Sequence, residues 1–207
     1  MDFMQVFTLV TGVIYIILEI RQKNLMWVVG IATSLAAMWV FFRQGLYASF
    51  GLNTYYLITA FLGLWQWGKD RQKLGASAPK KAKSAKKSDR SAKKDTPTIH
   101  LNRLPWKTVI ISALVMVAGT FGMAQLMQLL ENPMSYLDSA VTVMSVVATW
   151  WLVRAYIQQW WLWIVADALS TYLCVSQGMW MMAVLYGAYS LSAIYGYIHW
   201  KRHGQYI

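Results

Sequence analysis

The chain has 207 residues, of which 57% are apolar and 13% charged, with a net charge of +11 and a mean hydropathy of +0.38. This composition excludes an ordinary soluble domain and predicts a chain that lies mostly in lipid. The sequence contains no G-x-x-x-x-G-K-[ST], H-E-x-x-H or C-x-x-C motif, and it has a single cysteine, Cys174, which we assign to packing. We therefore expect no cofactor, no metal site and no enzymatic activity.

Apolar runs of roughly 17–25 residues, the length that crosses about 30 Å of hydrocarbon, occur seven times along the chain. The predicted membrane spans are 3–20, 25–42, 47–67, 108–130, 137–156, 160–177 and 180–199. The first span has neither a basic leader nor a small-residue cleavage site, so we interpret it as a retained helix rather than a signal peptide.

The segment 69–107 holds thirteen of the nineteen Lys and Arg residues. Because positive loops mark the cytoplasmic side, seven helices put the N-terminus outside and the C-terminus inside, with a cytoplasmic tail at 201–207. The Lys, Ala, Ser and Pro content of 69–107 predicts a disordered cytoplasmic loop. Binding of anionic lipid headgroups by this loop is the alternative, and we expect no nucleic-acid partner.

Two parts of the chain share the pattern QG-x10-Y-x6-G-x3-W at a constant offset. The matched positions are Gln44, Gly45, Tyr56, Gly63 and Trp67 in the first copy and Gln177, Gly178, Tyr189, Gly196 and Trp200 in the second. Trp27 falls opposite Trp163 if three residues are deleted from the second copy.

The repeat predicts an all-α membrane protein with seven transmembrane helices in a 3+1+3 parallel-repeat arrangement. Its parts are a first three-helix bundle (1–68), the loop 69–107, a linking helix (108–135) and a second three-helix bundle (136–200). SWEET-type transporters have parallel repeats of this kind, with a substrate site near the membrane midplane. The repeat thus favours transport over catalysis.

Asp167 lies inside the apolar run WLWIVADALS, where a carboxylate costs about 2.5–3.5 kcal/mol at the centre of a membrane helix. No Lys or Arg lies within the apolar interior of any predicted span, so a proton, a hydrogen-bonding neighbour or a ligand must satisfy it. A cationic or amine-bearing substrate fits best. Helical spacing puts two Trp residues on the same face as this acid, where indole rings attract cations; the face comprises Trp160, Trp163, Asp167, Thr171 and Cys174.

Other helices present polar residues at the same spacing. The candidates are Asn53 and Tyr56 on 47–67, Thr142 with Ser145 and Thr149 on 137–156, and Tyr186 and Tyr189 on 180–199. Each has a structural alternative. Thr and Ser more often bond backbone or neighbouring helices, and a Trp near a helix end, such as Trp160, fits the interfacial aromatic belt equally well. Asp138 is a cap or a candidate gate, and we expect Glu19, beside Arg21 and Lys23, to form a surface ion pair.

Three stretches of the sequence resemble the Pnu vitamin transporters, a family that includes the PnuC nicotinamide riboside transporters. They are GLYASFGLNTYYLITAFLGLWQW at 45–67, LDSAVTVMSVVATWWLVR at 137–154 and W-x2-W-I-x2-D at 160–167. The resemblance implies a seven-helix SWEET-like fold, a homotrimer, and a facilitator of the bacterial inner membrane whose substrate is trapped by a soluble cytoplasmic kinase. It also implies a substrate site between the bundles, at Trp160, Trp163, Asp167 and Asn53, with Tyr56 and Tyr189 nearby.

The sequence departs from the nicotinamide riboside pattern at two positions, because that pattern has Asn where Asp167 stands and Gln where Asn53 stands. The signature FG-x-N-x-Y-Y-L and the acid look more like the PnuT branch of the family, which carries thiamine. We therefore predict thiamine as the substrate, since its thiazolium can stack on Trp and its amine can pair with a carboxylate. Nicotinamide riboside, which is also cationic, is the alternative, followed by riboflavin or a nucleoside.

Two other hypotheses stay open. One is a membrane sensor or scaffold that acts through the Lys-rich loop, with Asp167 as an interhelical hydrogen-bonding group. The other is a proton-coupled carrier in which Asp167 titrates.

Overall fold

The computed structural model describes residues 13–43, 47–77, 99–129 and 136–207, and these are almost entirely helical. A helical segment at 13–20, hereafter the N-terminal segment, precedes the named elements. These are α2 (Leu25–Arg43), α3 (Tyr47–Ser77), β1 (Ile99–Leu101), α5 (Trp106–Leu129), α6 (Tyr136–Val153), α7 (Gln159–Ser176), α8 (Trp180–His203) and β2 (Gly204–Tyr206). The predicted residues 3–12, the pair Gln44-Gly45 and the loop centre 78–98 lie outside the described residues.

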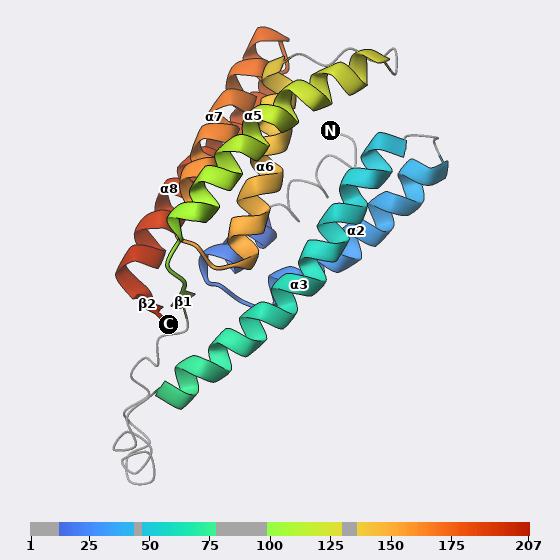
Figure 1. Ribbon diagram of the computed structural model, residues 1–207. Coiled ribbons are helices and arrows are strands. Elements are labelled where there is room, and N and C mark those ends of the chain that lie inside the picture. The colour runs from blue at the N-terminus through green and yellow to red at the C-terminus, as the bar shows by residue number, and fades with distance from the viewer. Residues whose placement is uncertain (1–12, 44–46, 78–98, 130–135) are drawn as a thin grey trace.

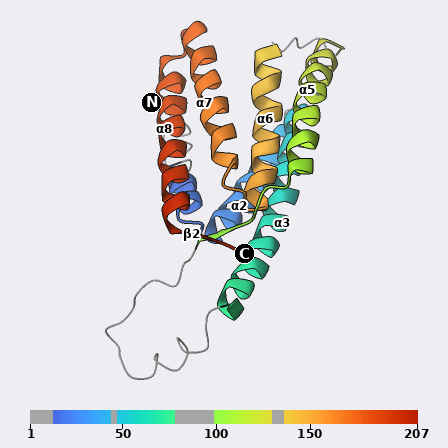
Figure 2. The ribbon, with the colours of Figure 1, turned by 60° about the vertical axis from the view of Figure 1, so that its left-hand side comes forward.

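The helices form two groups that meet at the end of the molecule that carries the strands, hereafter the strand end. Figure 1 shows the α2–α3 hairpin on one side and α5 to α8 on the other, with the C-terminus at the strand end. Turning the molecule, Figure 2 separates the pair α7 and α8 from the pair α5 and α6. The two groups contact each other through α3 and α6.

Large apolar side chains cover much of the outside of the helices. The side chains of Leu114, Leu129, Val184 and Leu191 are 65–82% exposed. Monomeric soluble proteins rarely expose continuous apolar faces of this kind, whereas lipid requires them. By length and hydropathy, two helices of the described chain, α5 and α6, could cross a membrane. The fold is an all-α membrane fold.

α3 is longer than the third predicted span, because the helix continues to Ser77 instead of ending at 67. Its extension is held by Asp70, which is fully buried. Asp70 Oδ2 accepts hydrogen bonds from Gln66 Nε2 at 3.0 Å and from Asn102 Nδ2 at 3.2 Å, and Lys73 pairs with its other oxygen at 3.4 Å. The polar residues after 67 predicted a loop, although the carboxylate of Asp70 among them lies in a packed interface.

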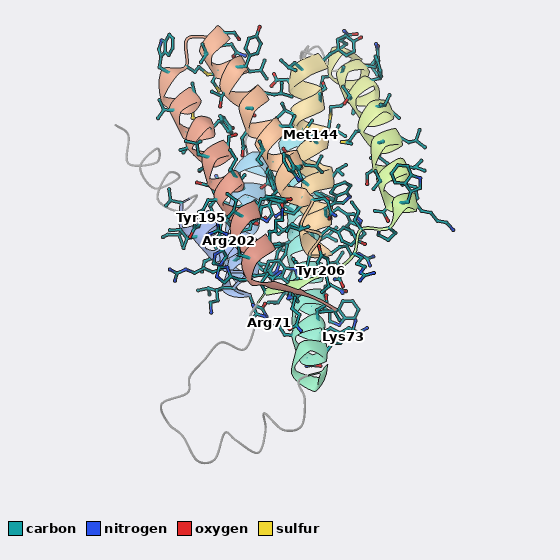
Figure 3. All side chains as sticks on the ribbon, turned by 90° about the vertical axis from the view of Figure 1, so that its left-hand side faces the viewer. Arg71, Lys73, Met144, Tyr195, Arg202 and Tyr206 are labelled. Carbon is teal, nitrogen blue, oxygen red and sulfur yellow. The ribbon has the colours of Figure 1, made fainter. Side chains whose placement is uncertain are left out.

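The prediction of a disordered segment 69–107 is also wrong at its far end, where β1 pairs in parallel with β2. Ile99 and Leu101 are each 1% exposed, so this short strand buries its apolar side chains. The predicted cytoplasmic tail 201–207 contains the end of α8 and all of β2. A strand of only three residues that pairs with a distant segment is difficult to predict from the local sequence. Figure 3 shows the labelled side chains of Arg71, Lys73, Arg202 and Tyr206 at this strand end.

The two copies of the repeat contain the same backbone turn. Gln22 and Ala155 have φ values of 48° and 54°, which are uncommon for residues other than glycine. They are separated by 133 positions, the offset between Tyr56 and Tyr189. Three hydrogen bonds of the first turn recur in the second at the same offset. The first turn has Gln22 N to Glu19 O, Lys23 N to Leu18 O and Trp27 N to Asn24 O. The second has Ala155 N to Leu152 O, Tyr156 N to Trp151 O and Trp160 N to Ile157 O.

This offset corrects the alignment of Trp27, which corresponds to Trp160 without any deletion rather than to Trp163. The environments agree as well. A Cβ added at Gly63 would lie 2.4 Å from the Trp27 ring, and one added at Gly196 would lie 2.5 Å from the Trp160 ring. Gly63 and Gly196 therefore each make room for the Trp of their own copy.

The last helix of each copy also contacts the first helix of the other copy. Trp67 Nε1 donates to the Leu152 carbonyl at 3.2 Å, and Trp200 Nε1 donates to the Ile20 carbonyl at 3.0 Å. The rings of these two Trp residues lie 6.4 Å apart, and Trp27 and Trp160 pack edge-on against them at 5.0 and 5.4 Å. Four buried indoles therefore form a continuous row that joins the two copies near the strand end.

Candidate functional site

A cavity of about 210 Å³ lies between the N-terminal segment, α7 and α8. Two carboxylates and four aromatic side chains surround it, and we call it the acidic cavity. Its lining residues are Tyr15, Ile16, Glu19, Trp160, Trp163, Asp167, Tyr189 and Ala193. Because a dry cavity of about 150 Å³ accommodates benzene, this one has room for an aromatic ring with substituents.

Asp167 reaches the acidic cavity from the middle of α7. Its side chain shares the face of Trp160 and Trp163, as the helical spacing predicts, and the residue is only 8% exposed. Among the described residues no Lys or Arg lines this cavity. A buried carboxylate without a cationic partner is costly, so a positively charged ring stacked on the indoles would offset much of that cost.

Glu19 corrects the sequence interpretation, because it lines the acidic cavity instead of forming a surface ion pair. It is 5% exposed, and Gln159 Nε2 donates to its Oε1 at 3.3 Å. The helical segment ends at 20 and the chain then turns, which leaves Arg21 and Lys23 exposed while Glu19 points inward. The signal was available, since Glu19, like Asp167, is a lone acid in an apolar run, but its sequence neighbours suggested pairing.

Polar atoms without partners occur in the lining of the cavity and in Gln159, which bonds to the lining residue Glu19. Gln159 is fully buried, and within the described part of the chain its Oε1 has no hydrogen-bond partner. The same holds for the indole nitrogens of Trp160 and Trp163. Trp160 is 2% exposed, so it is a core residue and not a member of an interfacial belt. Buried donors and acceptors left without partners suit a ligand that supplies them.

The remaining candidates lie around the acidic cavity rather than in its lining. Tyr186 packs edge-on against Tyr189, which does line it, with ring centroids 6.2 Å apart. Tyr56 lies near Tyr15 and Tyr186 but is not itself a lining residue. Asn53 is half-buried in α3 and is not among the lining residues.

Hydroxyl groups on α6 and α7 bond mostly to their own helices. Thr142 donates to the Asp138 carbonyl at 3.0 Å, and Thr171 donates to the Asp167 carbonyl at 2.8 Å. Neither threonine lines the acidic cavity. Asp138 lies in the first turn of α6, is half-buried, and is in electrostatic range of Tyr186. The candidate gate role of Asp138 stays a prediction.

A second cluster of buried polar groups closes the strand end. Gln22 and the backbone of His100 exchange two hydrogen bonds, at 2.8 and 2.9 Å, and Arg71 donates to the Gln22 carbonyl. The His100 ring is fully buried, with Nε2 3.8 Å from Asp70 Oδ2. Burial lowers the pKa of His100 to about 4, and this effect outweighs the opposing influence of Asp70. His100 is therefore neutral at physiological pH. We interpret this cluster as one that stabilises the fold and not as a binding site.

Comparison with known proteins identifies a family. Residues 2–202 match the family described as "Nicotinamide mononucleotide transporter". Relatives named nicotinamide riboside transporter PnuC include one from Haemophilus influenzae, 31% identical over 97 residues (47% of this chain, 41% of that protein). Those from Escherichia coli (strain K12) and Neisseria mucosa are 23% and 25% identical, cover 78% and 94% of this chain, and are themselves covered to 69% and 72%.

The fold has a counterpart among solved structures. The crystal structure of the vitamin B3 transporter PnuC superposes with a TM-score of 0.64 at 22% identity, over 94% of this chain and 80% of that one. At this identity the likeness concerns the fold alone. The chain spans less than half of the Haemophilus relative and about 70% of the other two relatives.

Proposed function

The chain belongs to the nicotinamide mononucleotide transporter family, and from that membership we propose that it carries nicotinamide riboside across a bilayer. The family is one of vitamin transporters and not of enzymes. The name shared by the relatives supports the riboside, and thus the alternative of the sequence analysis rather than its first choice, thiamine.

The single observation that carries the proposal is the acidic cavity, with two carboxylates, two indoles and, among described residues, no cationic side chain. A pyridinium ring can stack on Trp160 and Trp163 while its charge lies near Asp167. The same arrangement disfavours a phosphate ester, because a phosphate would bring like charges together in a medium of low dielectric. The cavity therefore supports the riboside over the mononucleotide.

Thiamine is the second candidate, and Asp167 is the observation that favours it. A carboxylate can pair with the thiazolium charge or with the aminopyrimidine amine, and here it lines the cavity where the nicotinamide riboside pattern has Asn. The charge argument applies equally to both vitamins. Only direct comparison of the two ligands distinguishes them.

The transport mechanism we propose is facilitated diffusion through a seven-helix, 3+1+3 parallel-repeat fold, in which one unit rocks against the other. The matching turns, glycines and Trp residues of the two copies support this arrangement. The proposal includes a homotrimer in the bacterial inner membrane, with the N-terminus outside and the strand end inside. A cytoplasmic riboside or thiamine kinase completes it by trapping the vitamin.

Calorimetric titration of the purified full-length chain with nicotinamide riboside, nicotinamide mononucleotide and thiamine tests the proposal. The riboside should bind most tightly, and the mononucleotide at least tenfold more weakly, a difference of about 1.4 kcal/mol. If thiamine binds more tightly than the riboside, thiamine becomes the proposed substrate, and the proposal that the chain is a vitamin transporter is unaffected. Binding of none of the three vitamin forms would refute the proposed site.

A further inference from the structure

We propose that Glu19, held by Gln159, is a second recognition group of the acidic cavity and that it binds the hydroxyl groups of the riboside. This inference rests on the proposed function and deepens it. It divides the site into a region for the charged ring, at Asp167, and a region for the sugar, at Glu19.

The contacts of Glu19 leave much of its hydrogen-bonding capacity for a ligand. A carboxylate offers about four acceptor positions, and in the described part of the chain Glu19 receives one hydrogen bond, from Gln159. The Oε1 of that Gln has no partner within the same residues. Glu19, which lines the cavity, therefore presents open acceptor positions and suits a ligand with donors, such as neighbouring hydroxyls. Acidic side chains bind ribose hydroxyls in the same way in dinucleotide-binding folds.

Glu19 borders the cavity at the start of α7, where it bonds Gln159, and Asp167 borders the cavity further along the same helix. Gln159 begins α7 and Asp167 follows eight positions later, a rise of about 12 Å along the helix. Trp160 and Trp163 lie between them on the face that lines the cavity. A nucleoside whose base stacks on these indoles would direct its charge toward Asp167 and its sugar toward Glu19.

Glu19 and Asp167 also come from different parts of the fold. Glu19 belongs to the N-terminal segment of the first copy, whereas Asp167 and Gln159 belong to α7 of the second. A substrate that bonds to both acids bridges the two copies. Recognition of the sugar at Glu19 would thus report whether the copies have come together around the substrate.

The test compares two ligands that share a charged ring and differ in the sugar: nicotinamide riboside and 1-methylnicotinamide. Both are titrated into the wild-type chain, Glu19→Gln, Glu19→Asp and Asp167→Asn. Glu19→Gln should weaken riboside binding at least tenfold and leave 1-methylnicotinamide binding within about twofold. Asp167→Asn should weaken both ligands. Glu19→Asp retains the charge, so it should weaken the riboside less than Glu19→Gln does.

The outcomes separate the inference from the proposed function. If the wild-type chain binds the riboside and Glu19→Gln binds it equally well, the inference fails and the function stands. Equal losses for both ligands in Glu19→Gln would also overturn it, because they indicate a general electrostatic or folding role. If the wild-type chain does not bind the riboside at all, the proposed function fails and the inference with it.

Discussion

Asp167 shows how much a single charge in an apolar run reveals. Its helical spacing predicted the face that it shares with Trp160 and Trp163, and these three residues line one cavity with Tyr189. Glu19 escaped prediction because the local sequence does not say on which side of a turn a residue lies. Asn53, chosen from helical spacing and from the family resemblance, is not a lining residue; spacing reports a helix face but not the helix that packs opposite it.

At the scale of single residues, we expect Asp167→Asn to weaken binding of a cationic vitamin at least tenfold. The change keeps the shape of the side chain and removes the charge that faces the ligand, with little effect on the Thr171 hydrogen bond, which goes to the backbone of Asp167. Titration calorimetry measures the loss, and thermal unfolding checks that the variant is folded. Unchanged affinity in a folded variant would remove Asp167 from the site.

A second prediction at the residue scale concerns Gly196. We expect Gly196→Ala to destabilise the protein by about 1–3 kcal/mol, because its Cβ would lie 2.5 Å from the buried Trp160 ring. Gly187→Ala, in the same helix, is the matched control. A Cβ added there meets nothing within 4 Å, so this change should stabilise by about 0.5–1 kcal/mol. Thermal unfolding in detergent compares the two, and equal stabilities would contradict the packing described for Trp160.

At the scale of elements, the apolar helices were predictable and the strand end was not. The predicted spans 25–42 and 160–177 agree with α2 and α7 to within one residue at each end. Hydropathy failed where polar side chains are buried by distant partners, as with Asp70 in the extension of α3. The charged, low-complexity sequence of 69–107 predicted disorder throughout. It obscured the three buried residues of β1, which pair with a segment about a hundred positions away.

The burial of His100 beside α3 predicts a pH dependence for this element. Its pKa is about 4 when folded and about 6.5 when unfolded, so the unfolded chain binds the extra proton between these values. Stability from this group is therefore fully present above pH 6.5 and is lost as the pH falls toward 4, by up to about 3 kcal/mol.

Thermal unfolding between pH 4 and 7.5 measures this loss in the wild type and in His100→Gln, which cannot titrate in this range. We expect the difference in stability between the two proteins to change across that interval. Parallel curves would show that His100 is not the group responsible. Lys107→Gln is a suitable control, because Lys107 is an exposed residue in the first turn of α5.

At the scale of the whole molecule, the repeat was visible in a few aromatic and glycine positions. Only the structure gave its full register, which equates Trp27 with Trp160 and the turn at Gln22 with that at Ala155. The sequence pattern could not reveal that Trp67 and Trp200 bond across to the other copy, since those bonds go to backbone carbonyls. These ties hold the two copies together at the strand end, while the acidic cavity spans parts of both copies.

If this chain moves nicotinamide riboside down its gradient, uptake into liposomes should show it. Purified full-length chain is reconstituted without any kinase and supplied with labelled riboside. We expect uptake that ends when the inner and outer concentrations are equal and that is slower in Asp167→Asn. Uptake no faster than in protein-free liposomes, or accumulation above the outer concentration under an imposed pH gradient, would contradict it.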